Sequence, residues 1–167
     1  MSRLVVIDPV EYILEGQFER IDVPERTFLD EENVLLSIEQ YREDYVDKGL
    51  ALGELNDGFL IIPTVVEYDG KSIEAEQVDE EEKDPAFMII DIYWNRDRRT
   101  ICGKVILLDT EDGDKIKKAI GQGVECFMSA SQTEGYIVMD ENSGRMYYRI
   151  SNIRGYKISL FNFHNTV

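Results

Sequence analysis

The sequence predicts an α+β fold with a mostly antiparallel, β-barrel-like core and two or more helices. Three observations support this prediction. The chain has 167 residues, the length of one ordinary domain with room for a hydrophobic core. About nine short runs of apolar and β-branched residues are separated by turn residues, which is typical of strands. Only two segments have helical periodicity, and they do not alternate regularly with strands as in parallel α/β folds.

Two strands are expected before the first helix. Residues 4–7 form a short apolar run, and residues 12–21 form a longer one. Gly16 lies inside the second run, where a glycine indicates a bulge or the close approach of another backbone. Pro24 then ends the β region, because proline has no N–H to donate to a neighbouring strand.

A helix is predicted over residues 30–48. Asp30 has the side chain of a helix N-cap, and Gly49 is a typical helix terminator. Apolar residues recur at spacings of four, three and four, which places them on one helical face: Val34, Ile38, Tyr41 and Tyr45.

A β-hairpin followed by an acidic loop is predicted in the middle of the chain. Asp69-Gly70 is a strong turn signal between β runs over 59–68 and 71–78. An acidic run over 79–84 ends at Pro85. We interpret this run as a solvated loop, with a patch that binds a cation or a basic partner as the alternative.

The second half of the chain predicts six more strands and one more helix. The polar segments 95–99 and 142–144 have the composition of hairpin turns. The strands are expected over 87–94, 100–108, 124–129, 135–139, 145–150 and 156–163, and the helix over 112–121. The predicted core is Leu14, Phe18, Leu35, Ile38, Leu55, Phe87, Ile89, Ile92, Val105, Leu107, Ile116, Ile120, Phe127, Ile137, Tyr148 and Ile158.

The charge of the chain is strongly negative. There are 34 Asp and Glu residues against 18 Lys and Arg residues, a formal net charge of −16. Direct nucleic-acid binding and binding to an anionic membrane both depend on basic residues, so neither is expected. The N-terminus lacks the cationic and apolar regions of a signal peptide, so we expect synthesis in the cytoplasm.

No cofactor or metal is expected from the sequence. His164 is the one histidine, and Cys102 and Cys126 are too far apart in sequence for a typical zinc motif. The acidic segment 109–114 does not match a calcium loop, because Leu108 falls at the first ligand position. Gly121-Gln122-Gly123 is not followed by the Lys-Ser/Thr of a phosphate loop.

One segment resembles the signature of a known family. Residues 51–57, Ala-Leu-Gly-Glu-Leu-Asn-Asp, resemble the A-x-G-E-L-N-H motif of the tailed-phage prohead (capsid maturation) serine proteases, in the T-even-type branch. Further similar segments follow in the family's order from about residue 12 to 162: Glu15-Gly16 with Phe18, the apolar run 87–94, residues 102–105, residues 113–116 and Met128-Ser129-Ala130-Ser131. The chain therefore looks like one prohead-protease-like domain over residues 1–167, with a hairpin and acidic loop inserted at about 58–85.

The resemblance implies both a fold and a chemistry. The fold would be similar to that of the herpesvirus assemblins, a β-barrel ringed by helices. In this family a serine attacks the scissile amide, a histidine takes its proton, and a segment containing an arginine helps to hold the oxyanion. A serine hydroxyl needs such a neighbouring base because it is a weak nucleophile by itself.

The chain departs from the family pattern at the catalytic positions. Asp57 stands where the family has its histidine, and Ser129 matches the nucleophile. Residues 130–132, Ala-Ser-Gln, replace Ser-Arg-Gly. A carboxylate with an ordinary pKa of about 4 is a poor base for a hydroxyl. We therefore expect no catalytic residues, with Asp57 and Ser129 as degenerate positions and His164 as a remote candidate for a substitute base.

These observations predict a protein of the phage head, in the virion or prohead, that is made in the host cytoplasm. It would be a proteolytically inactive prohead-protease homologue that acts by binding capsid, scaffold or protease proteins. It would serve as a minor or decorating capsid component or as a regulator (inhibitor) of the protease. One alternative is an active serine protease that uses Ser129 to process capsid and scaffold proteins. Another is an interaction domain unrelated to phages.

Overall fold

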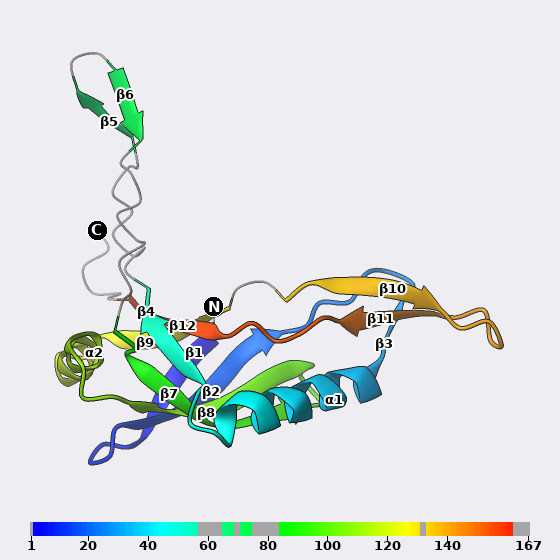
Figure 1. Cartoon of the computed structure of the whole chain (residues 1–167), viewed down its shortest axis with the longest axis horizontal. Helices are drawn as coiled ribbons and strands as arrows, with labels where there is room; N and C mark the ends of the chain where they lie inside the picture. The colour runs from blue at the N-terminus through cyan, green and yellow to red at the C-terminus, as the bar shows by residue number, and fades with distance from the viewer. Residues whose placement is uncertain (1, 57–64, 69–70, 75–83, 131–132, 162–167) are drawn as a thin grey trace.

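The centre of the molecule is a closed seven-stranded barrel (Figure 1). The computed structural model describes residues 2–56, 65–68, 71–74, 84–130 and 133–161. The barrel strands are β1 (Ser2–Asp8), β2 (Ile13–Arg20), β4 (Leu52–Leu55), β7 (Phe87–Asn95), β8 (Thr100–Leu107), β9 (Glu125–Ala130) and β12 (Tyr156–Phe161). Their order around the barrel is β1-β2-β8-β7-β4-β12-β9, and only β4 and β12 are parallel neighbours. Together with the two α-helices of the described residues, this confirms the predicted α+β, barrel-like fold.

Two paired glycines allow neighbouring groups to pack closely against the barrel wall. Gly16 on β2 lies opposite Gly103 on β8. A Cβ atom on Gly16 would collide with the backbone carbonyl of Arg3, and one on Gly103 would collide with the carbonyl of Asp91 and the ring of Phe18. The close approach predicted for Gly16 is therefore confirmed.

The first helix, α1 (Glu31–Tyr41), begins as predicted. Asp30 caps it, because its Oδ1 accepts a hydrogen bond of 3.1 Å from the backbone N–H of Asn33. The buried residues Val34, Ile38 and Tyr41 recur at the predicted helical spacing.

The predicted helix does not stay α-helical to its end. Its last turn is a π-helix, η1 (Arg42–Val46), in which the N–H of Asp47 bonds to the carbonyl of Arg42 at 2.8 Å. The Arg42 side chain also donates a hydrogen bond to the carbonyl of Ile92 on β7, which ties this wider turn to the barrel. Gly49, at φ +67°, lies in the turn after it, where a left-handed residue is needed.

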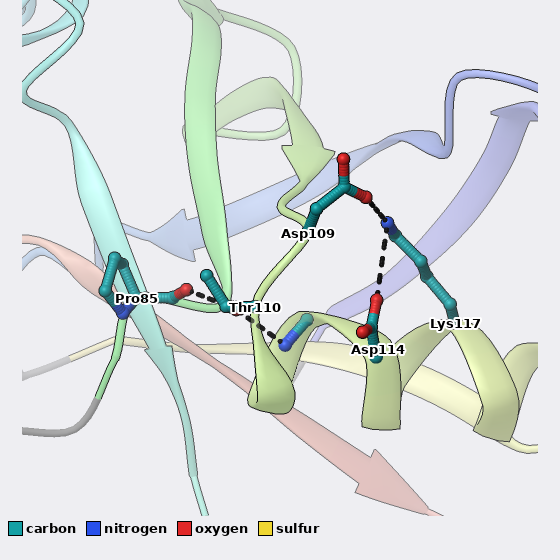
Figure 2. Close-up of polar contacts among 6 residues, drawn as sticks. Pro85, Asp109, Thr110, Asp114 and Lys117 are labelled. Atoms are coloured by element: carbon teal, nitrogen blue, oxygen red, sulfur yellow. Dashed lines mark hydrogen bonds and ion pairs between the residues drawn. The ribbon is translucent and has the colours of Figure 1, made fainter.

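The second helix, α2 (Glu111–Gly121), is fixed to the barrel through Thr110. The Thr110 hydroxyl accepts a hydrogen bond of 3.0 Å from the N–H of Gly113 and donates one of 2.7 Å to the carbonyl of Pro85 (Figure 2). One side chain therefore caps α2 and anchors the chain where it enters β7.

Lys117 on α2 links this helix to the chain segments before α2 and before β2. Its ammonium lies 2.6 Å from an Asp109 carboxylate oxygen and 3.7 Å from one of Asp114 (Figure 2). It also lies 5.2 Å from the ring centre of Tyr12, just before β2. The hydrogen bond from Lys117 lowers the pKa of Asp109.

The core lies inside the barrel and under α1, with three corrections to the predicted set. Leu35 and Ile137 are 50% and 49% exposed, and Phe127 is half-buried. Leu35 falls beside the buried stripe of α1, and Ile137 lies on a strand outside the barrel. The predicted residues that are buried are Leu14, Phe18, Ile38, Leu55, Phe87, Ile89, Ile92, Val105, Leu107, Ile116 and Ile158, with Ile120 and Tyr148 packed against them.

Two smaller sheets complete the described structure. One has the order β10 (Gly135–Met139), β11 (Met146–Ile150), β3 (Phe28–Leu29), and the short β3, which the sequence pattern did not predict, runs parallel to β11. The other pairs β5 (Val65–Tyr68) with β6 (Lys71–Glu74), within the predicted hairpin. The remainder of that hairpin and the acidic residues 79–83 lie outside the described residues. No helix in the described part of the chain is long and apolar enough to span a membrane.

Candidate functional site

Three adjacent barrel strands bring together the protease-like motif and Ser129, the degenerate position that matches the family's nucleophile. On β9, Ser129 lies directly opposite Lys157 of β12. On the other side of β12, Lys157 lies opposite Glu54 of β4. Because residues opposite one another in neighbouring strands share a face of the sheet, these three form one row across the sheet. We call Ser129, Lys157 and Glu54 the Ser129 row.

The Ser129 row lies on the outer surface of the barrel. The residues that alternate with it along β9 and β12 are buried: Cys126, Met128, Tyr156 and Ile158. Ser129 is partly exposed, and the side chains of Lys157 and Glu54 are 52% and 44% exposed. A peptide could therefore reach this row from solvent without opening the barrel.

The described part of the chain shows no base hydrogen-bonded to Ser129. Among the described residues, no group forms a hydrogen bond with its hydroxyl. The Lys157 ammonium instead lies 3.9 Å from the carboxylate of Glu54. Lysine becomes a general base where burial removes water from its ammonium, and half of the Lys157 side chain is exposed.

Each central residue of the protease-like motif has a structural role in this chain. A Cβ on Gly53 would overlap the ring of Phe87, so only glycine fits there. Leu55 is buried in the core, and Glu54 forms the ion pair of the Ser129 row. Asn56 donates from its backbone N–H to the Ile158 carbonyl at 2.7 Å.

The Asn56 side chain adds a second contact between the end of β4 and β12. Its amide nitrogen donates to the Ser159 hydroxyl at 3.2 Å. Ser159 in turn lies opposite Phe127, whose ring meets that of Phe161 edge-on at 6.2 Å. These contacts fix the end of β4 against β12.

The described residues that flank 57–83 lie at neighbouring points of the barrel. On the N-terminal side, Asn56 follows the end of β4. On the C-terminal side, the N–H of Ala86 bonds to the carbonyl of Gly53 at 2.8 Å, and the Thr110 hydroxyl donates to the carbonyl of Pro85. Asn56 and Ala86 therefore both lie beside β4, which carries Glu54 of the Ser129 row.

The chain after Ser129 is anchored by Glu19 of β2. Its carboxylate accepts hydrogen bonds from the N–H and the hydroxyl of Thr133, at 2.9 and 2.6 Å. It also accepts one of 3.2 Å from the hydroxyl of Tyr156, and burial together with the Glu19 charge raises the Tyr156 pKa. The Glu19 carboxylate therefore positions the chain at Thr133 and at the start of β12.

The other sequence-predicted site residues lie outside the described part of the chain. These are Asp57, His164 and residues 131–132. Sequence reasoning missed the neighbours of Ser129. Glu54 belongs to the motif and was detectable, whereas Lys157 gives no signal, because its place depends on the register between β4 and β12.

The cysteines offer no alternative nucleophile. Both thiols are buried and free. Burial raises the pKa of Cys126 to about 11 and also raises that of Cys102, which favours the unreactive thiol form. Within the described residues, no cluster of three or more His, Cys, Asp or Glu side chains has the arrangement of a metal site.

Comparisons with known proteins give one distant similarity. No family model matches the chain, and no curated protein matches it. Among solved structures, the chain is similar to the bacteriophage T4 capsid assembly protease, gp21, with 18% identity and a TM-score of 0.48. The match covers 90% of this chain and 82% of that one. This similarity is too distant to assign an activity.

Proposed function

We propose that this protein is a phage head morphogenesis protein that acts by binding, as a proteolytically inactive homologue of the prohead proteases. The observation that carries the proposal is the surroundings of Ser129. The motif and order of segments resemble those proteases, yet the Ser129 hydroxyl has no base among the described residues. Its opposite neighbour is a cation engaged by Glu54.

The chemistry of acyl transfer explains why these surroundings favour inactivity. A serine hydroxyl must lose its proton as it attacks the amide carbon, and a base must receive that proton. An exposed, ion-paired ammonium has no lone pair to accept it. At the position of the family's histidine, Asp57 supplies a carboxylate, which is too weak a base for this step. Loss of one triad member removes several orders of magnitude in rate.

The proposed role is binding within the phage head or prohead. The partners would be capsid, scaffold or prohead protease proteins, and the protein would be a minor or decorating component or a regulator of the protease. The net charge of −16 suits partners with basic surfaces. We further propose that residues 1–167 form one domain, with residues 58–85 inserted beside the former catalytic row.

Incubation with phage scaffold and capsid substrates tests this proposal. We expect no cleavage by the wild-type chain and no difference for Ser129→Ala. Ser143→Ala is the matched control, because Ser143 is exposed in the turn after β10 and lies outside the Ser129 row. Cleavage that disappears in Ser129→Ala and persists in Ser143→Ala would overturn the proposal.

The alternative function is an active serine protease with a relocated base. The observation that favours it is the partial exposure of Ser129 on the outer face of the barrel. The base would be His164 or Asp57. If this alternative holds, His164→Ala or Asp57→Asn abolishes Ser129-dependent cleavage, whereas Lys157→Ala leaves it in place.

A further inference from the structure

The strongest feature outside the Ser129 row is the sheet of β3, β10 and β11, which extends away from the barrel (Figure 1). We call β10, β11 and their connecting turn, residues 135–150, the arm. Large apolar side chains are exposed on the arm and on the adjoining β3: Tyr136 48%, Ile137 49%, Met139 57%, Met146 42% and Phe28 52%. Large apolar side chains are therefore exposed on both faces of the arm, and clustered exposed apolar side chains mark interaction surfaces.

The arm also presents an open strand edge. β10 is the outermost strand of its sheet, and no strand in the described part of the chain pairs with its outer edge. Its side chains alternate between faces, so Ile137 and Met139 lie on one face while Tyr136 and Val138 lie on the other. An extended peptide that joined this edge would gain backbone hydrogen bonds and apolar contacts on both faces.

One face of the arm contains a hollow with a negative lining. The hollow has a volume of about 480 Å³, and Val138 and Tyr147 form its apolar wall. Three carboxylates line it, from Asp30, Asp140 and Glu141. The lining also contains Arg149, whose guanidinium forms an ion pair with an Asp30 oxygen at 2.7 Å.

The shape and charge of the hollow suit a basic side chain. A Lys or Arg side chain has an apolar stem, which would lie against Val138, and a cationic head, which the carboxylates and the ring of Tyr147 would attract. Glu141 is exposed and makes no hydrogen bond or ion pair with another described residue, so its charge is available to a partner.

The arm is held in shape before any partner binds. In its turn, the Asp140 carboxylate accepts hydrogen bonds from the N–H of Asn142 at 3.1 Å and the hydroxyl of Ser143 at 2.9 Å. Gly144, at φ +69°, completes the turn, and its N–H bonds to the Asp140 carbonyl at 2.8 Å. A preformed edge costs less ordering entropy on binding than a mobile one.

We propose that the outer edge of β10 binds an extended segment of a partner protein in which apolar and basic residues alternate. The segment adds a strand to β10 and inserts a Lys or Arg side chain between Tyr147 and Glu141. This inference rests on the proposed binding function and specifies its surface and the chemistry of its partner. A second copy of this chain is a poor occupant, because two chains with a charge of −16 each repel one another.

Fluorescence anisotropy with synthetic peptides tests the proposal. The probe is a labelled peptide of alternating valine and lysine, and its control has glutamate in place of each lysine. We expect the lysine peptide to bind and the glutamate peptide not to bind. Glu141→Lys should weaken binding by roughly tenfold, because it reverses a charge that contacts the partner. The control Glu39→Lys makes the same charge change at an exposed position of α1 and should leave binding unchanged.

Hydrogen exchange with the lysine peptide bound checks the mode of binding. Strand addition should protect backbone amides of residues 135–139 and leave amide exchange in the 96–99 turn unchanged. Equal binding by wild type and Glu141→Lys, no binding by wild type, or no protection at 135–139 would overturn the proposal. So would a dimer in sedimentation experiments that Tyr136→Ser dissociates, since a second copy would then occupy the edge. These outcomes are independent of Ser129-dependent cleavage, so the proposed function can fail while the docking site survives, and the reverse also holds.

Discussion

The Ser129 row and the arm differ in whether their side chains are used in contacts within the fold or remain exposed. In the row, the residues that resemble a protease motif hold the barrel together: Gly53 accommodates Phe87, and Glu54 pairs with Lys157. In the arm, no residue matches the motif, yet apolar side chains and a strand edge remain uncovered among the described residues. The residues of the sequence resemblance therefore contribute to the fold of this molecule, while the binding surface that we propose lies on the arm.

The largest expected difference between these regions is the energetic cost of losing an isoleucine. Ile158 on β12 is fully buried, whereas Ile137 on the arm is 49% exposed. We expect Ile158→Ala to lower the free energy of unfolding by about 3–4 kcal/mol and Ile137→Ala by less than about 1 kcal/mol. Urea denaturation of both variants measures this. Equal losses would show that the arm is part of the core and not a free surface.

The next largest effect tests whether the motif glycine is structural. Gly53→Ala should destabilise the fold by about 2–3 kcal/mol, because its Cβ would overlap the ring of Phe87. Gly121→Ala is the matched control, since a Cβ there would meet no atom within 4 Å. Thermal unfolding of the two variants gives the comparison. A Gly53→Ala protein as stable as wild type would remove the structural explanation of the motif.

An intermediate effect is expected at alkaline pH. Burial in the barrel raises the pKa of Cys126 from 9.0 to about 11, so the folded state keeps its proton more tightly than the unfolded state. The resulting stability is fully present below pH 9.0 and is lost as the pH rises toward 11. Between about pH 8 and 10.5, this thiol should account for a loss of roughly 1–2 kcal/mol.

Cys126→Ala isolates this contribution. The variant should be less stable than wild type near pH 8 because it leaves a small cavity, but its stability should fall less between about pH 8 and 10.5 than that of wild type. Denaturant titrations at the two pH values measure the difference. Parallel pH profiles would mean that the Cys126 thiol is not buried as the barrel requires.

The smallest expected effect concerns the ion pair of the Ser129 row. Glu54 and Lys157 are about half exposed and 3.9 Å apart. A double-mutant cycle with Glu54→Gln and Lys157→Met should give a coupling energy below about 1 kcal/mol. A coupling of several kcal/mol would indicate a desolvated pair, and Lys157 would then deserve a test as a base.

The barrel was predictable because its strands alternate and its turns carry strong local signals. The sequence predicted the cap at Asp30 and the close approach at Gly16, since both depend on local chemistry. It did not predict the π-turn at 42–46, which is stabilised by a contact with Ile92, or the two-residue β3, which is too short to show a period. The opposition of Ser129 and Lys157 depends on strand register, which no local pattern encodes.

The measurement that tests the central claim most directly is the rate at which a fluorophosphonate labels Ser129, determined by peptide mass spectrometry. An activated serine reacts far faster than an ordinary one, so Ser143, whose hydroxyl donates to Asp140 and accepts from the N–H of Arg145 in an exposed turn, provides the internal reference. We predict that Ser129 is labelled no faster than Ser143. Labelling of Ser129 about a hundredfold faster or more, and lost in His164→Ala, would contradict the account.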